Sequence, residues 1–226
     1  TYWFSDTAAR CRAAFGLGGS HQLVFTAARG SSGTLTDTLS YDAPSVHALA
    51  QGNGPALGGR VLSVSGFSFG RFDASPRAQV AGGAAHGHLA GGTGCEATEW
   101  ASESALVCVV ARGLFSPKDV AATVAVQVAT STSLFTYDRP MAERLVFPNG
   151  PASGGLTSTV TGQNFGWLDM SPTVRVGGSM SEATKWLSDS AILVKLTPGA
   201  GLALDATVTV AGLLATAVKG YTYDKA

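Results

Sequence analysis

The sequence predicts an all-β protein made of tandem immunoglobulin-like β-sandwiches, with about seven strands in each. Three observations support this fold class. Apolar and small polar residues alternate over short runs, as in strands that bury one face. Gly and Pro clusters interrupt these runs, and Gly is abundant, with 29 residues of 226. A unit of about 90 residues is repeated along the chain, which suits a small antiparallel sandwich.

The predicted strands fall in matching segments, one in each copy of the unit. Within them, β-branched residues alternate with small residues, a pattern that favours strands. No apolar stripe of helical period and convincing length is present. The matching runs are 77–81 with 173–177, 105–111 with 191–197, and 122–128 with 206–212.

Two short phrases recur and define the repeat. Trp3, Trp100 and Trp186 begin the phrases "WFSDT", "WASES" and "WLSDS". A Tyr-Asp pair then closes each copy of the unit. The closing tyrosines are Tyr41, Tyr137 and Tyr223.

These phrases divide the chain into three domains. Residues 1–42 match only the second half of the unit, whereas residues 43–138 and 139–226 are complete copies. The two complete copies differ mainly by an insertion at residues 84–94, as expected of a loop on a conserved scaffold.

Composition argues against two classes of partner. Lys+Arg and Asp+Glu number 15 each, so the formal net charge is zero. A basic surplus, which dominates nucleic-acid affinity, is absent, and so is a polybasic membrane patch. The longest apolar run, at residues 105–111, is much shorter than the roughly 20 residues of a transmembrane helix. We therefore expect neither nucleic-acid binding nor membrane insertion by this segment.

The combination of motifs resembles the IPT/TIG domain family. Its pattern is nearly intact in "GGLTSTVTGQNFG" (154–166), followed by "RVGG" (175–178), the Trp phrase and the closing "YTYD" (221–224). This family comprises immunoglobulin-like modules of plexins, of some transcription factors and of many large surface proteins. The resemblance implies β-sandwiches in about two and a half copies, and no common enzymatic activity.

In surface proteins the family often contains a disulfide, and the cysteines of this chain suggest one. Cys95 and Cys108 flank Trp100, and both are replaced in the last copy, by Ser181 and Val194. We expect a Cys95–Cys108 disulfide, in an extracellular or cell-surface location. Cys11 corresponds to Cys108, so its partner is expected outside the chain. The alternative is three reduced cysteines that act as small buried hydrophobes.

The repeated aromatic residues are predicted to be structural. A tryptophan beside an inter-strand crosslink packs like the core Trp of antibody domains, and the acid and hydroxyl after it can fix a turn. The alternative is a ligand platform of exposed tryptophans. The residues assigned this structural role are Trp3, Trp100, Trp186, Tyr41, Tyr137 and Tyr223.

No residue set predicts catalysis, and we expect neither enzymatic activity nor a cofactor. "GFSFG" (66–70) fits the G-x-S-x-G nucleophile elbow, but Ser68 lies in an all-β unit and Asn164 replaces it in the matching segment. We expect a turn instead, with Phe69 and Phe165 covering one end of each core.

Metal binding is only weakly indicated. His86 and His88 are separated by one residue and could face one side of a strand, but no third ligand is evident. The recurring "FDASP" (72–76) and "LDMSP" (168–172) supply too few oxygens for calcium, and turns before proline are expected there.

The connections between units suggest the function. The opening of the next unit follows each Tyr-Asp pair at once, with Pro44 or Pro140 at the joint and no flexible linker, which favours a stiff rod. We therefore expect a non-enzymatic structural or adhesive array in a surface fibre or filament. The expected partners are neighbouring domains of the same protein or further copies of it, through exposed strand edges. O-linked glycans are possible at residues 30–38 and 129–133.

Three alternatives remain. A receptor ectodomain would expose an apolar patch at a joint. A carbohydrate-associated module of a secreted enzyme would align exposed aromatics such as Phe72 and Trp167. A transcription-factor module is disfavoured by the zero net charge and the cysteine pattern.

Overall fold

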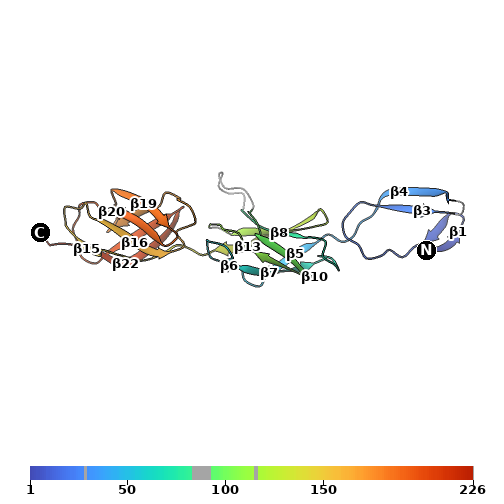
Figure 1. Cartoon of the computed structure of the whole chain (residues 1–226), viewed down its shortest axis with the longest axis horizontal. Helices are drawn as coiled ribbons and strands as arrows, with labels where there is room; N and C mark the ends of the chain where they lie inside the picture. Colours follow the sequence, from blue (N-terminus) through green and yellow to red (C-terminus); the bar gives the residue numbers. More distant parts are fainter. Residues whose placement is uncertain (28–29, 83–92, 115–116, 226) are drawn as a thin grey trace.

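The computed structural model describes residues 1–27, 30–82, 93–114 and 117–225, and in these ranges it contains strands and no α-helix. Accordingly, no helix within them could span a membrane. The strands form three groups that follow one another along the long axis (Figure 1). We call them unit 1 (1–42), unit 2 (43–138) and unit 3 (139–226).

Unit 2 is a sandwich of two sheets. The four-stranded sheet has the order β10-β11-β7-β5 and the five-stranded sheet the order β6-β13-β12-β8-β9. The strands of the first sheet are β5 (Ser45–Leu49), β7 (Val61–Phe67), β10 (Ala97–Ser102) and β11 (Ala105–Val109). Those of the second are β6 (Asn53–Gly54), β8 (Arg77–Gly82), β9 (Thr93–Gly94), β12 (Lys118–Val124) and β13 (Gln127–Tyr137).

Unit 3 repeats this topology strand for strand. Its sheets have the orders β14-β16-β20-β19 and β15-β22-β21-β17-β18. The strands of the first sheet are β14 (Met141–Leu145), β16 (Thr157–Gln163), β19 (Ala183–Ser188) and β20 (Ala191–Lys195). Those of the second are β15 (Asn149–Gly150), β17 (Thr173–Val176), β18 (Ser179–Met180), β21 (Leu204–Val210) and β22 (Leu213–Tyr223).

The predicted all-β, immunoglobulin-like fold class is confirmed. Within the described residues each complete unit has more strands than the expected seven. The additional strands are only two residues long and lie at the sheet edges; they are β6, β9, β15 and β18. Two residues are too few to show an alternating pattern, so such strands leave no periodic signal in the sequence.

Each complete unit has its own hydrophobic core between its sheets. Burial alternates along the central strands, as in β7 and β16, because successive side chains point to opposite faces. The core of unit 2 includes Leu62, Val64 and Leu106, and that of unit 3 includes Val160, Ile192 and Val208. Two separate cores make units 2 and 3 distinct packing units.

Unit 1 consists of two hairpins. They are β1 (Tyr2–Ser5) with β2 (Ala8–Arg10), and β3 (His21–Thr26) with β4 (Ser32–Leu39). In unit 2 the strands that match β2 and β3 pair with β7 and β8, but unit 1 has no counterparts of these. Trp3 is 74% exposed in unit 1, and its packing in a core stays a prediction.

Candidate functional site: the joints between units

The recurring Trp phrase forms a bulged β-hairpin. Ser102 Oγ accepts a hydrogen bond from the backbone N–H of Ser104 at 3.2 Å, and Ser188 does the same for Ser190 at 3.3 Å. In unit 1, Ser5 Oγ accepts a hydrogen bond from the backbone N–H of Thr7. In all three hairpins the strand register shifts between the tryptophan and this serine. The phrase thus recurs because each copy builds the same turn.

The tryptophans themselves pack differently in the three units. Trp100 is half-buried against the core of unit 2, and its Nε1 donates to the carbonyl of Gly70 at 3.2 Å. Trp186 also packs against its core, but its buried Nε1 has no hydrogen-bond partner among the described residues. The indole of Trp100 therefore ties its hairpin to the loop that contains Gly70.

The three closing tyrosines make one conserved contact. Tyr41, Tyr137 and Tyr223 each donate their hydroxyl to a backbone carbonyl, at 2.9 Å in every unit. The acceptors are Ala14, Ala111 and Thr197, each two residues before a glycine whose Cβ would overlap the tyrosine ring. These glycines, Gly16, Gly113 and Gly199, were missed by sequence reasoning, although each stands 24 or 25 residues before its tyrosine, which was a usable signal.

The loop after β7, and its counterpart after β16, forms the pole of each complete unit that faces the preceding unit. Ser68 has a positive φ of 59° and Asn164 one of 60°, so the G-x-S-x-G sequence builds a turn. Phe69 and Phe165 are fully buried. Asp73 accepts the N–H of Ser75 within the same loop, and the "LDMSP" segment repeats this turn.

Cys95 and Cys108 form a disulfide, with 5.6 Å between their Cα atoms. Cys95 also donates its backbone N–H to the carbonyl of Ala78. In unit 3, Ser181 takes the place of Cys95, and both its N–H and its hydroxyl donate to the carbonyl of Val174. A hydrogen bond thus replaces the crosslink. Cys11 is free and exposed, so a partner outside the chain stays a prediction.

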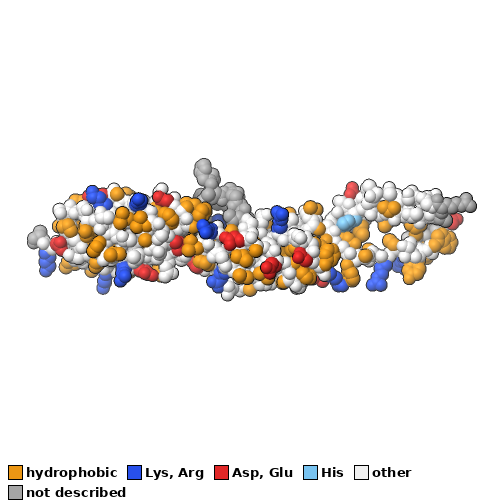
Figure 2. Space-filling view, in the orientation of Figure 1, with side chains coloured by type: hydrophobic (Ala, Val, Ile, Leu, Met, Phe, Trp, Pro, Cys, Tyr) orange, Lys and Arg blue, Asp and Glu red, His pale blue; other side chains and the backbone are white. Residues whose placement is uncertain are grey.

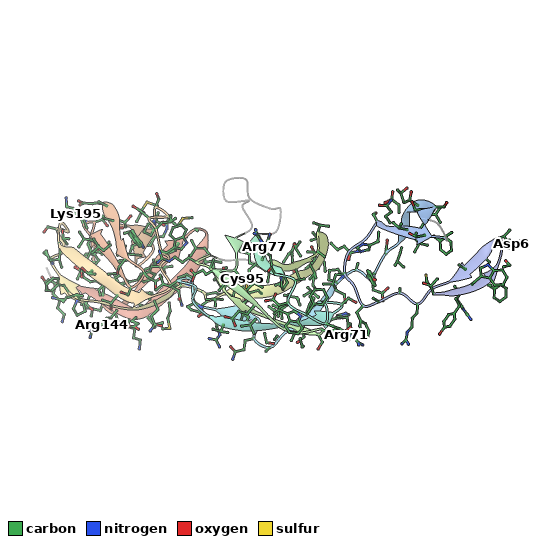
Figure 3. The ribbon with its side chains drawn as sticks, turned by 45° about the vertical axis from the view of Figure 1, so that its right-hand side comes forward. Asp6, Arg71, Arg77, Cys95, Arg144 and Lys195 are labelled. Carbon is green, nitrogen blue, oxygen red and sulfur yellow. A yellow bond between two sulfur atoms is a disulfide. The ribbon has the colours of Figure 1, made fainter. Side chains whose placement is uncertain are left out.

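The first joint, which we call joint 1, lies between units 1 and 2. Leu17 packs against the core of unit 2, and a Cβ on Gly70 would lie only 2.8 Å from Leu17 Cδ1. The Arg71 guanidinium stands 4.0 Å above the ring centre of Phe15, and its Nε lies 3.6 Å from Glu103. Figure 3 shows Arg71 at the end of unit 2 that faces unit 1.

Joint 1 contains a hollow of about 220 Å³. Its lining combines the segment before β3 with the loop after β7, and includes Phe15, Leu17, Tyr41, Ser68 and Phe72. Gln127 at the start of β13 also donates from Nε2 to the carbonyl of Tyr41, at 3.5 Å. Joint 1 is thus a contact of three segments.

The second joint, joint 2, lies between units 2 and 3 and repeats the approach of a leucine to a glycine. A Cβ on Gly166 would lie 3.4 Å from Leu114 Cδ2. Leu114 stands six residues after Cys108, as Leu17 stands six residues after Cys11, and Gly166 matches Gly70. Both joints therefore place a leucine of one unit against a glycine of the next.

The weak metal candidates receive no support. His86 and His88 lie outside the described residues, and the described part of the chain contains no group of three or more His, Cys, Asp or Glu that could hold a metal ion. Phe72 and Trp167, proposed as aligned aromatics, do not occupy matching positions: Phe72 matches Leu168, whereas Trp167 matches Arg71.

Comparison with known families agrees with this architecture. Residues 144–224 match the model of the IPT/TIG domain, and this part of the chain is an IPT/TIG domain. The predicted IPT/TIG family is therefore confirmed for residues 144–224, and its tandem arrangement stays a prediction. A comparison with curated protein sequences finds no match.

Solved structures with similarity to the chain include a plexin and two glycan-binding proteins. The plexin A4 extracellular region is 22% identical over 81% of this chain and 16% of that chain, with a TM-score of 0.38. SGBP-B from a xyloglucan utilization locus of Bacteroides uniformis is 15% identical over 80% of this chain and 50% of that chain, with a TM-score of 0.33. The surface glycan-binding protein PbSGBP-B from Prevotella bryantii is 12% identical over 79% of this chain and 42% of that chain, with a TM-score of 0.47. The chain spans half or less of each.

Proposed function

We propose that the chain is part of a tandem IPT/TIG array that acts as a stiff, non-enzymatic, extracellular segment of a surface fibre or filament. The observation that supports this most is that both joints place a leucine of one unit against a glycine of the next, Leu17 at Gly70 and Leu114 at Gly166. A contact repeated at each boundary fixes the angle between neighbours, and a fixed angle is what a spacer needs.

The segment between units 2 and 3 is held from both sides. β13 ends at Tyr137 and β14 begins at Met141. Asp138 accepts a hydrogen bond from the side-chain amide of Asn53 and donates its N–H to the carbonyl of Gly54. The next carbonyl, that of Arg139, accepts from Asn164 Nδ2 at 3.2 Å. Because each residue before Pro140 is bonded to one unit or the other, little freedom remains for a hinge.

Two further features support an extracellular and non-catalytic role. The Cys95–Cys108 disulfide is typical of oxidising compartments. Ser68, the serine of the G-x-S-x-G sequence, belongs to a turn that Asn164 reproduces in unit 3. Positive and negative side chains are interspersed on the face shown in Figure 2, which suits close packing of neighbouring modules.

The carbohydrate-associated alternative has no comparable support. It would require aromatic side chains aligned on one open face, and the two candidates belong to joints instead. Phe72 lines the hollow of joint 1, and Trp167 directly follows Gly166 in joint 2. We therefore assign these aromatics to contacts between units.

The proposal is tested first by electron microscopy of the native, full-length protein without reducing agent. Regularly beaded filaments are the expected result. Small-angle scattering from the 226-residue chain should also give the narrow, elongated distance distribution of a rod. Separate molecules with freely varying angles between beads would contradict the proposal.

A further inference from the structure

Units 2 and 3 each leave one regular strand edge open. β10 and β19 end the four-stranded sheets, and within the described ranges each has one hydrogen-bonded neighbour, with which it keeps a regular register over its first four residues. The opposite end strands, β5 and β14, contain a register shift after two residues and lie against the second sheet. The five-stranded sheets end in two-residue strands, and the long strands β13 and β22 are bulged. Short and bulged edges resist pairing with another chain, so β10 and β19 remain available.

These two edges carry opposite charges at the same position. Along both strands, exposed and half-buried residues alternate in the same phase. The third residue of each is exposed, and it is Glu99 in β10 and Lys185 in β19. In the described part of the chain neither side chain takes part in a salt bridge. Each edge therefore presents one unpaired charge, negative in unit 2 and positive in unit 3.

An antiparallel pairing of β10 with the β19 of a second copy brings these charges together. Residues that stand directly opposite each other share a face of the sheet, so Glu99 and Lys185 then lie side by side on the outer face. The other opposite pairs follow from this register and contain no like charges. They are Ala97 with Leu187, Thr98 with Trp186, Trp100 with Thr184, and Ala101 with Ala183.

The same charges disfavour the pairing of each edge with itself. In the corresponding register, β10 against a second β10 places Glu99 opposite Glu99, and β19 against a second β19 places Lys185 opposite Lys185. Like charges directly opposite each other are destabilising. The two edges thus reject their own kind and accept each other, which is how like-charge repulsion gives an interface its specificity.

We propose that copies of this chain associate laterally through an antiparallel β10–β19 contact, in which Glu99 pairs with Lys185. This inference rests on the function proposed above and deepens it, because it names the edges that join neighbouring copies in a fibre. Each chain has both edges, so it can hold one neighbour through unit 2 and another through unit 3. A contact of this heterologous kind allows a row of chains to grow.

Sedimentation of the 226-residue chain tests the contact. A Cys11→Ser background is used, because the exposed thiol of Cys11 would otherwise crosslink copies. The chain should associate reversibly, and less so at high salt. Glu99→Lys and Lys185→Glu should each weaken association roughly tenfold, because like charges then meet. An equimolar mixture of the two variants should restore it, because every β10–β19 contact between them again joins opposite charges.

A matched control variant separates the pairing from a change in net charge. Glu143→Lys makes the same charge change at an exposed position of β14, the opposite end strand of its sheet, and should leave association unchanged. Amide hydrogen exchange of the associated chain should show new protection in β10 and β19 and none in β14.

The outcomes distinguish this contact from the rod itself. A chain that stays monomeric from micromolar to millimolar concentration overturns the lateral contact, while the elongated shape measured by scattering stands. Association that both variants retain, that mixing does not restore, or that Glu143→Lys weakens equally overturns the pairing of Glu99 with Lys185. A shape without elongation contradicts the rod and leaves the result of the mixing experiment unaffected.

Discussion

Two neighbouring tyrosines in unit 3 differ in how their hydroxyl groups are satisfied. Tyr221 and Tyr223 pack edge to face, with ring centres 5.0 Å apart. Tyr223 donates to the carbonyl of Thr197, whereas the buried hydroxyl of Tyr221 has no partner among the described residues. In unit 2 the position of Tyr221 is occupied by Phe135, which is fully buried. The unpaired hydroxyl is therefore a local cost that unit 2 avoids.

The two tyrosines should respond in opposite ways to the same substitution. We expect Tyr221→Phe to raise the free energy of unfolding of unit 3 by about 1 kcal/mol, because it removes an unsatisfied buried group. Tyr223→Phe is the matched control and should lower it by about 1 kcal/mol, because a made hydrogen bond is lost. Urea denaturation followed by unit-resolved amide signals measures both changes. Equal losses would show that the Tyr221 hydroxyl has a partner.

Tyr221 also predicts how stability depends on pH. Burial, together with Tyr223 and Asp224 nearby, raises the pKa of Tyr221 above its usual value of 10.0. Because folding favours the neutral form of Tyr221, its contribution to the free energy of unfolding is fully present below pH 10. Above that pH the unfolded chain ionises first, and stability falls until the folded pKa is reached. Unit 3 should lose stability above pH 10, and denaturation curves of Tyr221→Phe should show a smaller loss.

At the scale of elements, the alternating strands and the turns could be predicted from the sequence, because each depends on a local pattern. The turn at Ser68 and the burial of Phe69 followed from such patterns. The pairing of Arg71 with Phe15 could not be predicted, since the two residues are distant in sequence and meet only across a joint.

The disulfide of unit 2 can be replaced by the residues that occupy the same positions in unit 3. Cys95→Ser with Cys108→Val reproduces Ser181 and Val194. We expect unit 2 to lose roughly 3 kcal/mol, the chain-entropy value for a closed loop of about 14 residues. Thermal unfolding with and without a reducing agent measures this loss. Unit 3 is the internal control, and a reducing agent should have no further effect on the double variant.

At the scale of the whole molecule, the joint leucine should control stiffness. Leu114→Ala removes the side chain that meets Gly166, so we expect joint 2 to bend more freely while both sandwiches stay folded. Small-angle scattering should then show a shorter, broader distance distribution. Leu202→Ala alters an exposed leucine of unit 3 outside the joint and should leave the distribution unchanged. An unchanged distribution for Leu114→Ala would place the stiffness in the connecting segment alone.

The short parallel strands have a mechanical consequence for such a rod. β6 runs parallel to the end of β13, and β15 runs parallel to the end of β22. When the chain is pulled from both ends, tension acts on the start and the end of each unit in opposite directions. The backbone bonds from Thr136 to Gly52 and from Asp138 to Gly54 are then sheared together and do not open one after another. Units 2 and 3 are thus each closed by a short parallel strand pair whose hydrogen bonds are loaded in shear.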